Sequence, residues 1–144
     1  MKKTFSVIIL IFLVIIVCLY MNYKDMLINK NSVRKFNKEY EFYNKEAVLG
    51  TDITTIINKA INSNEKFNIE KDVNDLYIPN DSNSIKIYII FSEKDNRYYP
   101  MESLIQNNFE DFTKYFGGAE FKCVNVKYHE KTGQIAEMIF SVIE

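Results

Sequence analysis

The sequence is poor in the residues that mark several structural classes. Its 144 residues contain no Trp, two Cys, two Pro, four Gly and one His. Two cysteines cannot make the disulfide framework of a small secreted domain, and a single His leaves few ligands for a zinc site. The scarcity of Gly and Pro excludes a collagen-like chain, and a hydrophobic content of 47% excludes a wholly disordered one. The length suits one globular domain.

A long apolar run near the N-terminus is the clearest feature that is present. Within residues 5–21, Ser6 is the only clearly polar member, and two lysines precede the run. As a helix it spans roughly 25 Å, near the lower limit for a membrane crossing. No A-x-A-like cleavage site follows, which favours an uncleaved anchor over a signal peptide. We therefore predict a basic N-terminus (1–4) and one transmembrane helix (5–23) that contacts lipid in the cell membrane.

The charges beside this run nearly balance, so they fix the orientation weakly. The basic residues near its C-terminal end, offset by Asp25, are Lys24, Lys30, Arg34 and Lys35, and those on the other side are Lys2, Lys3 and the amino terminus. The positive-inside rule is close to a tie on these flanks. The order of a basic start followed by an apolar run is typical of signal sequences. We accordingly predict that the C-terminal domain lies outside the cytoplasm.

Charge is divided unevenly along the rest of the chain. Residues 22–45 carry six basic and three acidic side chains, a net charge of +3. Residues 46–144 carry ten basic and sixteen acidic side chains, a net charge of −6. The basic segment suits anionic headgroups, whereas an acidic domain repels nucleic acid. For this reason Tyr88, Tyr98 and Tyr99 are interpreted as packing or partner contacts and not as a platform for stacked bases.

The basic segment forms part of a predicted amphipathic neck helix over residues 24–49. Its apolar positions recur at helical spacing: Met26, Val33, Phe36, Tyr40, Tyr43 and Ala47. Such a stripe must be buried against something, and about two heptads are too few to indicate a coiled coil. We favour burial on the protein's own domain. The alternative is self-association or a protein partner that contacts Val33, Phe36, Tyr40 and Tyr43.

The remaining residues, 50–144, predict a small α+β domain. The expected elements are a helix over 53–61 capped by Thr51 or Asp52, a polar loop over 62–83 with a short extended piece at 76–78, a strand over 85–91, a turn at 93–96, a returning strand over 97–99 and a helix over 101–116. We expect Gly117 and Gly118 to end that helix in the left-handed conformation.

The C-terminal residues predict a β-hairpin. Its strands are 121–129 and 134–143, and the turn contains Gly133 in the left-handed conformation, with Glu130 paired to Gln134. The expected pairs are Tyr128 with Ala136, Lys127 with Glu137, Val126 with Met138 and Val124 with Phe140. The whole domain is then an antiparallel sheet of about four strands with helices on one face.

The residues that could carry catalysis are few. Cys123 and His129 are six residues apart on one predicted strand, about 20 Å, which is too far for a nucleophile and its base. We expect Cys123 to be a small buried hydrophobe and His129 to lie at a solvated strand end. No phosphate-binding or nucleophile-elbow motif is present, and the polar loop lacks the EF-hand pattern. We predict no catalytic, cofactor or metal site and a non-enzymatic interaction or assembly module; a hydrolase without a recognisable motif remains an alternative.

Four stretches of the chain have a distinctive sequence. They are Phe36-Asn37-Lys38-Glu39-Tyr40-Glu41-Phe42-Tyr43, Gly50-Thr51-Asp52-Ile53 with Ile56-Ile57-Asn58-Lys59-Ala60, Phe121-Lys122-Cys123, and Tyr128-His129-Glu130-Lys131-Thr132-Gly133. They resemble a group of small single-pass membrane proteins of low-GC Gram-positive bacteria that has no assigned activity. The resemblance implies a membrane anchor and no particular chemistry.

The order of elements resembles a second group. An apolar N-terminal helix, an amphipathic continuation and a sheet are similar to the architecture of type IV pilins and pseudopilins. This chain has Lys3-Thr4-Phe5-Ser6-Val7 where that family has a Gly, an aromatic residue and a Glu five residues into the mature helix. A pilin-like structural subunit is therefore the second functional hypothesis, and it rests on architecture.

Overall fold

The computed structural model describes residues 2–92, 97–106 and 109–143, which form two units. The first unit is Met1–Lys35 and the second is Phe36–Glu144. The first consists of most of the long helix α1 (Lys2–Lys45), and the second contains the last turns of α1 and an α+β domain. The fold class expected from the sequence is confirmed.

In the first unit, α1 exposes its apolar residues. Between Ile11 and Leu27 the large hydrophobic side chains are from 40% (Leu27) to 65% (Phe12) exposed. Among the residues that the structure describes, one helix is long enough and apolar enough to cross a membrane, and that helix is α1. An α-helix suits such a run because it satisfies every backbone polar group within the segment.

In the second unit, the last turns of α1 are buried on the domain. Tyr40 and Tyr43 are 2% and 6% exposed, and the Phe36 ring lies 5.1 Å from that of Tyr40. The Asn37 side chain donates to the Gly133 carbonyl at 2.8 Å and accepts from the Ile135 amide at 3.0 Å. The expected burial of the stripe on the protein's own domain is confirmed for these aromatic residues.

The C-terminal boundary of the predicted neck helix is wrong. α1 ends at Lys45, and the short strand β1 (Val48–Leu49) follows after Glu46 and Ala47, of which Ala47 is exposed. In the sequence, the helical spacing of apolar residues continues to Ala47, which is why the helix was predicted to extend to residue 49. Pairing of Val48 with Phe121 in the sheet overrides it, because the strand buries Val48 to 3% exposure.

The burial of α1 gives a stability prediction. Tyr40→Ala should lower the free energy of unfolding of the domain by about 1–4 kcal/mol, because the large side chain leaves a cavity. Phe42→Ala is the matched control: Phe42 is on the same helix but 59% exposed, and its truncation should change stability by less than about 1 kcal/mol. Chemical denaturation of the full chain in detergent measures both; equal effects of the two variants would contradict the prediction.

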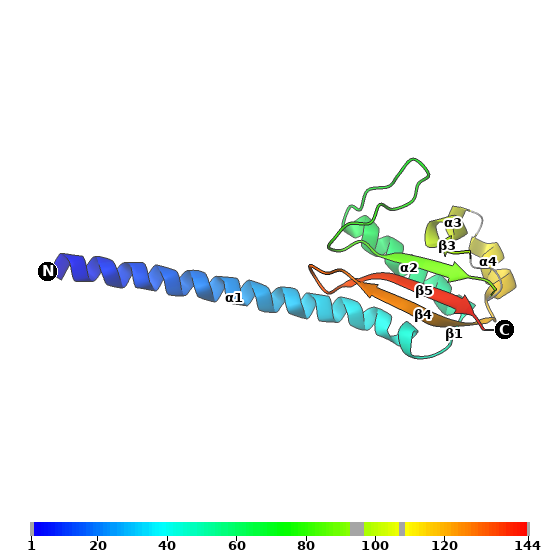
Figure 1. The fold of residues 1–144 in the computed structure, drawn as a ribbon, viewed down its shortest axis with the longest axis horizontal. Coiled ribbons are helices and arrows are strands. Elements are labelled where there is room, and N and C mark those ends of the chain that lie inside the picture. The colour runs from blue at the N-terminus through cyan, green and yellow to red at the C-terminus, as the bar shows by residue number, and fades with distance from the viewer. Residues whose placement is uncertain (1, 93–96, 107–108, 144) are drawn as a thin grey trace. The chain divides into compact units, whose positions relative to one another are not determined.

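The sheet has five strands in the order β1-β4-β5-β2-β3 (Figure 1). The remaining strands are β2 (Lys86–Ile90), β3 (Tyr99–Pro100), β4 (Glu120–Tyr128) and β5 (Ile135–Val142). The expectation of about four antiparallel strands is wrong in one respect: β2 runs parallel to β5. β5 lies between β4, with which it is antiparallel, and β2, with which it is parallel. The sheet is therefore mixed.

Helices cover one face of this sheet. Figure 1 shows α2 (Gly50–Lys66) behind the strands, with α3 (Met101–Gln106) and α4 (Phe109–Phe116) near one end of the sheet. Four apolar residues of α2 are completely buried: Ile53, Ile56, Ile57 and Ala60. The predicted turn at 93–96 lies outside the described residues, and so do residues 107–108 between α3 and α4.

The Asp52 carboxylate caps α2 as expected, although Asp52 lies within the helix, whereas the length of α2 and the end of α4 differ from expectation. Leu49 is the N-cap residue of α2, and its backbone amide donates to the Asp52 carboxylate at 3.1 Å. The helix continues to Lys66. Gly117 and Gly118 do not have positive φ angles. At Gly50, glycine is required because the backbone after α4 approaches closely. A Cβ on Gly50 would lie 1.8 Å from the Phe116 carbonyl oxygen. The Gly50 amide donates to the Ala119 carbonyl, which joins the start of α2 to the end of α4.

The hairpin of β4 and β5 forms with part of the expected register. Val126 pairs with Met138 and Lys127 with Glu137, and Gly133 has φ +71° as predicted. The other pairs are wrong: Tyr128 opposes Ile135, Cys123 opposes Phe140, and the His129 amide donates to Gln134.

Irregularities in β4 explain these differences. The register shifts between Cys123 and Asn125 and again after Lys127. An extra residue in one strand reverses which side chains face the core. Val124 and Tyr128 are therefore 54% and 53% exposed, whereas Cys123 is buried.

Candidate binding pocket

The two residues considered for a catalytic dyad have separate partners. The Cys123 thiol lies 3.4 Å from the Asn125 carbonyl, and burial raises the pKa of the Cys123 thiol. His129 is 7% exposed, so the expectation that it is solvated is wrong; its Nε2 lies 2.7 Å from the Ser84 carbonyl oxygen. The loop before β2 covers His129, and sequence reasoning about β4 alone could not place that loop.

The burial of Cys123 predicts low reactivity. Cys123→Ser should destabilise the folded protein by about 1 kcal/mol or more, because it places a hydroxyl in apolar surroundings. Alkylation by iodoacetamide should be much slower in the folded protein than in denaturant, since a raised pKa and burial both reduce the accessible thiolate. Mass spectrometry of peptides that contain Cys123 measures the rate, and equal rates in the two states would contradict the prediction.

The polar loop before β2 is ordered by its own side chains. The Asp72 carboxylate accepts from the Asn74 and Leu76 amides at 2.8 and 3.0 Å, and these bonds, that of Leu76 first, lower the pKa of Asp72. The Asn80 side chain similarly accepts from the Ser82 amide at 3.0 Å. In the described parts of the chain, no three His, Cys, Asp or Glu residues are grouped as metal ligands.

A buried ion pair lies beside this loop. Lys86 Nζ is 2.7 Å from Glu102 Oε1, and the two side chains are 8% and 5% exposed. The same carboxylate oxygen accepts from the Tyr77 amide at 3.0 Å. Two donors thus share Oε1, and the pair joins β2, α3 and the loop.

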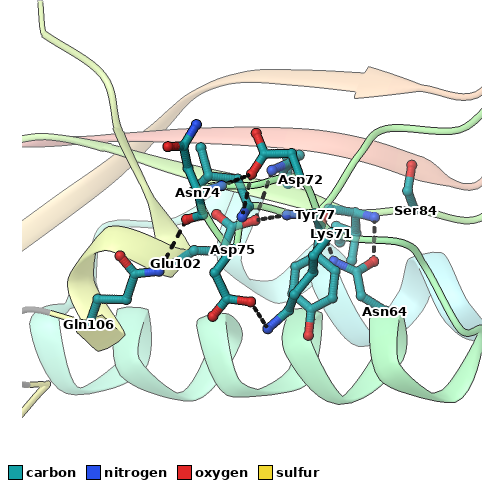
Figure 2. Close-up of polar contacts among 12 residues, drawn as sticks. Asn64, Lys71, Asp72, Asn74, Asp75, Tyr77, Ser84, Glu102 and Gln106 are labelled. Atoms are coloured by element: carbon teal, nitrogen blue, oxygen red, sulfur yellow. Dashed lines mark hydrogen bonds and ion pairs between the residues drawn. The ribbon is translucent and has the colours of Figure 1, made fainter.

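A buried amide fixes α2 to the backbone just before β2. Asn64 is completely buried; its Nδ2 donates to the Ile85 carbonyl at 2.8 Å and its Oδ1 accepts from the Ile85 amide at 2.9 Å. The side chain therefore pairs with one residue of backbone as a neighbouring strand would. Figure 2 shows Asn64 at one side of the polar cluster.

The loop, α2 and α3 form a small, partly open pocket of about 150 Å³. Its walls are the side chains of Ile61, Glu65, Lys71, Asp75, Tyr77, Glu102, Ile105 and Gln106. In Figure 2 the labelled residues of this set gather beside α2. The pocket combines an apolar wall from two isoleucines with charged groups from three different elements.

Two buried polar atoms belong to residues that line this pocket. Glu102 Oε2 and the Tyr77 hydroxyl have no hydrogen-bond partner among the described residues. Both residues are 4% exposed, and burial raises the pKa of Tyr77. Because buried polar groups are nearly always hydrogen-bonded, this deficit marks the pocket as the candidate site.

Charged groups at the rim are partly paired with one another. Lys71 Nζ lies 3.2 Å from Asp75 Oδ1 and 4.9 Å from the centre of the Tyr77 ring. The hydrogen bond with Asp75 raises the pKa of Lys71. Gln106 Nε2 donates to the Asn74 carbonyl at 3.4 Å, which holds α3 against the loop.

Sequence reasoning did not identify this pocket. Lys86 alternates with Ile85 and Ile87 in the sequence, a pattern that predicts the polar face of a strand for Lys86. Nothing near Lys86 in the sequence indicates Glu102 as its partner. A signal for Asn64 did exist: it follows Ala60 by four residues and so continues the apolar stripe of α2. A polar residue on such a stripe indicates a buried hydrogen-bonding role.

The tyrosines considered as an aromatic platform separate into two groups. The Tyr88 and Tyr98 rings meet edge to face at 6.3 Å, whereas Tyr99 contacts Phe91 at 5.1 Å. Phe91 packs on the hydrophobic core, and Tyr98 is 55% exposed. The three rings therefore do not form one continuous surface.

Comparison of the chain with protein-family models, with curated proteins and with solved structures finds no match. The functional argument therefore rests on the geometry described above.

Proposed function

We propose that this protein is a single-pass membrane protein whose uncleaved helix presents a non-enzymatic α+β domain for interaction or assembly. The observation that carries the proposal is the exposure of α1: its apolar side chains from Ile11 to Leu27 are at least 40% exposed, whereas the α+β domain buries its own core. An apolar surface of this length needs lipid or protein around it. The acidic domain then carries the specific contacts.

Crosslinking in native membranes tests the interaction. A photoreactive amino acid is placed singly at Tyr98, Tyr115 or Val124, which are 55%, 71% and 54% exposed and so accept a substitution without disturbing the core. We expect one of these positions to give a protein adduct of defined mass, identified by mass spectrometry, while the others serve as matched controls. Absence of a protein adduct at all three positions would contradict the proposal.

The orientation is tested separately. We expect a C-terminal alkaline phosphatase fusion to be active in intact cells, because the basic N-terminus favours the cytoplasmic side. An inactive phosphatase together with an active cytoplasmic reporter at the same position would reverse the orientation.

A pilin-like or pseudopilin-like structural subunit is the second hypothesis. One observation favours it: α1 continues from an apolar segment into turns whose residues, Tyr40 and Tyr43, are part of the domain core. The intact mass of the membrane-extracted protein separates the two hypotheses. We expect the full mass of 17.0 kDa; removal of a short N-terminal leader would make the pilin-like subunit the better account.

A further inference from the structure

One side of α1 carries aromatic and basic side chains at the end of the apolar run and just beyond it. All of them are exposed: Tyr20, Tyr23, Lys24, Lys30, Arg34 and Lys35. At about 100° per helical residue they fall within an arc of about 140°, which we call the basic face. We propose that the basic face binds the headgroups of anionic phospholipids. This inference rests on the proposed membrane insertion of α1 and names the class of lipid that the helix selects.

The positive charge of the basic face is not compensated within the protein. None of its four basic side chains forms an ion pair among the residues that the structure describes. Asp25 is the one acidic residue in positions 1–35, and it lies about 150° around the helix from the centre of the arc. A helix face with this excess of positive charge attracts an anionic surface.

Two observations favour a lipid surface over an acidic protein as the occupant. Tyr20 and Tyr23 lie on the same face as the lysines, and tyrosine is enriched at membrane–water interfaces, where its ring contacts apolar groups and its hydroxyl contacts polar ones. The charge also begins where the apolar run ends, because Lys24 directly follows the last residue of the predicted transmembrane helix. Basic clusters in this position are attracted to anionic headgroups.

Helix geometry ranks the basic residues by their distance from the bilayer. At a rise of 1.5 Å per residue, Lys24, Lys30 and Lys35 lie about 2, 10 and 18 Å beyond Tyr23 along the helix axis. The headgroup layer is about 5–7 Å thick on each side of a bilayer. The field of an anionic surface falls off over about 10 Å in 0.1 M salt. Lys24 and Lys30 should therefore contribute most to lipid selection, and Lys35 should contribute least.

Electron spin resonance of the full chain in phosphatidylcholine vesicles tests this selection. Spin-labelled phosphatidylglycerol and phosphatidylcholine with the same labelled acyl chain are compared, because they differ in headgroup charge. The quantity measured is the ratio of their association constants for the motionally restricted lipid around α1. In about 20 mM NaCl we expect a ratio of about 3 or more in favour of phosphatidylglycerol, falling toward 1 in about 0.5 M NaCl. The two leaflets have the same composition, so the result does not depend on orientation.

Matched variants locate the selection. A triple variant of the basic face, with Lys24→Gln, Lys30→Gln and Lys35→Gln, should lower the ratio to below about 1.5. Of the single variants, Lys30→Gln should lower the ratio more than Lys35→Gln. The control variant removes the same charge from three exposed lysines of the α+β domain and should leave the ratio unchanged: Lys66→Gln, Lys114→Gln and Lys122→Gln. All of these side chains are exposed, so the core is not altered.

A second salt separates lipid headgroups from free phosphate as the ligand. Sodium phosphate and NaCl at equal ionic strength should lower the ratio equally, because both act by screening. A stronger effect of phosphate would indicate a site for the free anion and would overturn the proposal.

The remaining outcomes separate this inference from the proposed function. A preference for phosphatidylglycerol that is lost in the basic-face variant and kept in the domain variant supports the inference. Restricted lipid with a ratio near 1 overturns it, leaves an acidic protein as the occupant of the basic face, and keeps the membrane insertion of α1. A ratio that is unchanged in the basic-face variant, or equally lowered in the domain variant, also overturns it. Absence of restricted lipid of either kind would show that α1 is not in the bilayer, and both proposals would then fail.

Discussion

Replacing Asn64 with Asp is expected to lower the free energy of unfolding by about 3–5 kcal/mol at pH 7, because it puts an unpaired charge in the core. The Asn64 amide forms two hydrogen bonds with the Ile85 backbone and has no exposed surface. A carboxylate still accepts from the Ile85 amide, but its second oxygen faces the Ile85 carbonyl, and no donor joins them. The variant therefore loses one bond and gains a repulsion.

The loss should depend on pH in a definite direction. Burial raises the pKa of the introduced carboxyl above its value in the unfolded chain, so the folded state binds the proton more tightly. The destabilisation is then greatest above the folded-state pKa and shrinks as the pH falls through it, since a protonated carboxyl can donate to the Ile85 carbonyl. The measurement is urea denaturation of variant and parent at pH 7 and pH 4, compared at each pH.

Asn58→Asp is the matched control for this experiment. Asn58 lies on the same helix and is exposed, so the same change of charge should alter stability by less than about 1 kcal/mol at either pH. A similarly small effect of Asn64→Asp, or a loss that does not diminish at low pH, would show that the paired amide is not what holds α2 to β2.

Removal of one member of the buried ion pair should have an effect of the same size. Lys86→Met is expected to destabilise the domain by about 3–5 kcal/mol, because it leaves the Glu102 carboxylate buried with the Tyr77 amide as its remaining described donor. Adding Glu102→Gln should restore much of the loss, since the neutral amide still accepts from Tyr77. Thermal or chemical denaturation of the two single variants and the double variant measures the coupling.

The pair of Lys127 and Glu137 offers a control with the same geometry. Its Nζ to Oε1 distance is also 2.7 Å, but the Lys127 side chain is 61% exposed. Exposed pairs contribute about 0–1 kcal/mol, so Lys127→Met should have a small effect. If the two lysine variants destabilised the protein equally, burial would not be the factor that separates them.

The hairpin illustrates how far local sequence reasoning extends. Its turn depends on Gly133, whose φ of +71° suits glycine. The pairing next to the turn differs from the prediction, and the pair of Lys127 with Glu137 is recovered only because the register shifts between Lys127 and Tyr128. The irregularity after Cys123 has no such marker in the sequence. Residues beyond it therefore exchange faces, which is why Val124 was expected in the core and is exposed.

The candidate pocket shows the opposite case, in which nothing local was sufficient. Its lining residues come from α2, the loop and α3, and the outermost two, Ile61 and Gln106, are 45 positions apart in the chain. The patterns indicated these helices and most of the loop, but α2 continues to Lys66 and so includes Glu65, which was expected in the loop. No pattern indicated that Lys86 and Glu102 meet, because contacts between distant elements depend on how those elements pack.

The sequence by itself determined the apolar N-terminal helix, the amphipathic α2, the second hairpin and the α+β class, because these follow from periodicity and turn chemistry within a few residues. Only the tertiary structure decided that β2 runs parallel to β5, that His129 is covered by the loop at Ser84, and that Asn64 pairs with Ile85. Each of these joins residues far apart in the chain, and the free energy that selects them comes from burial and from satisfying polar groups in a shared core.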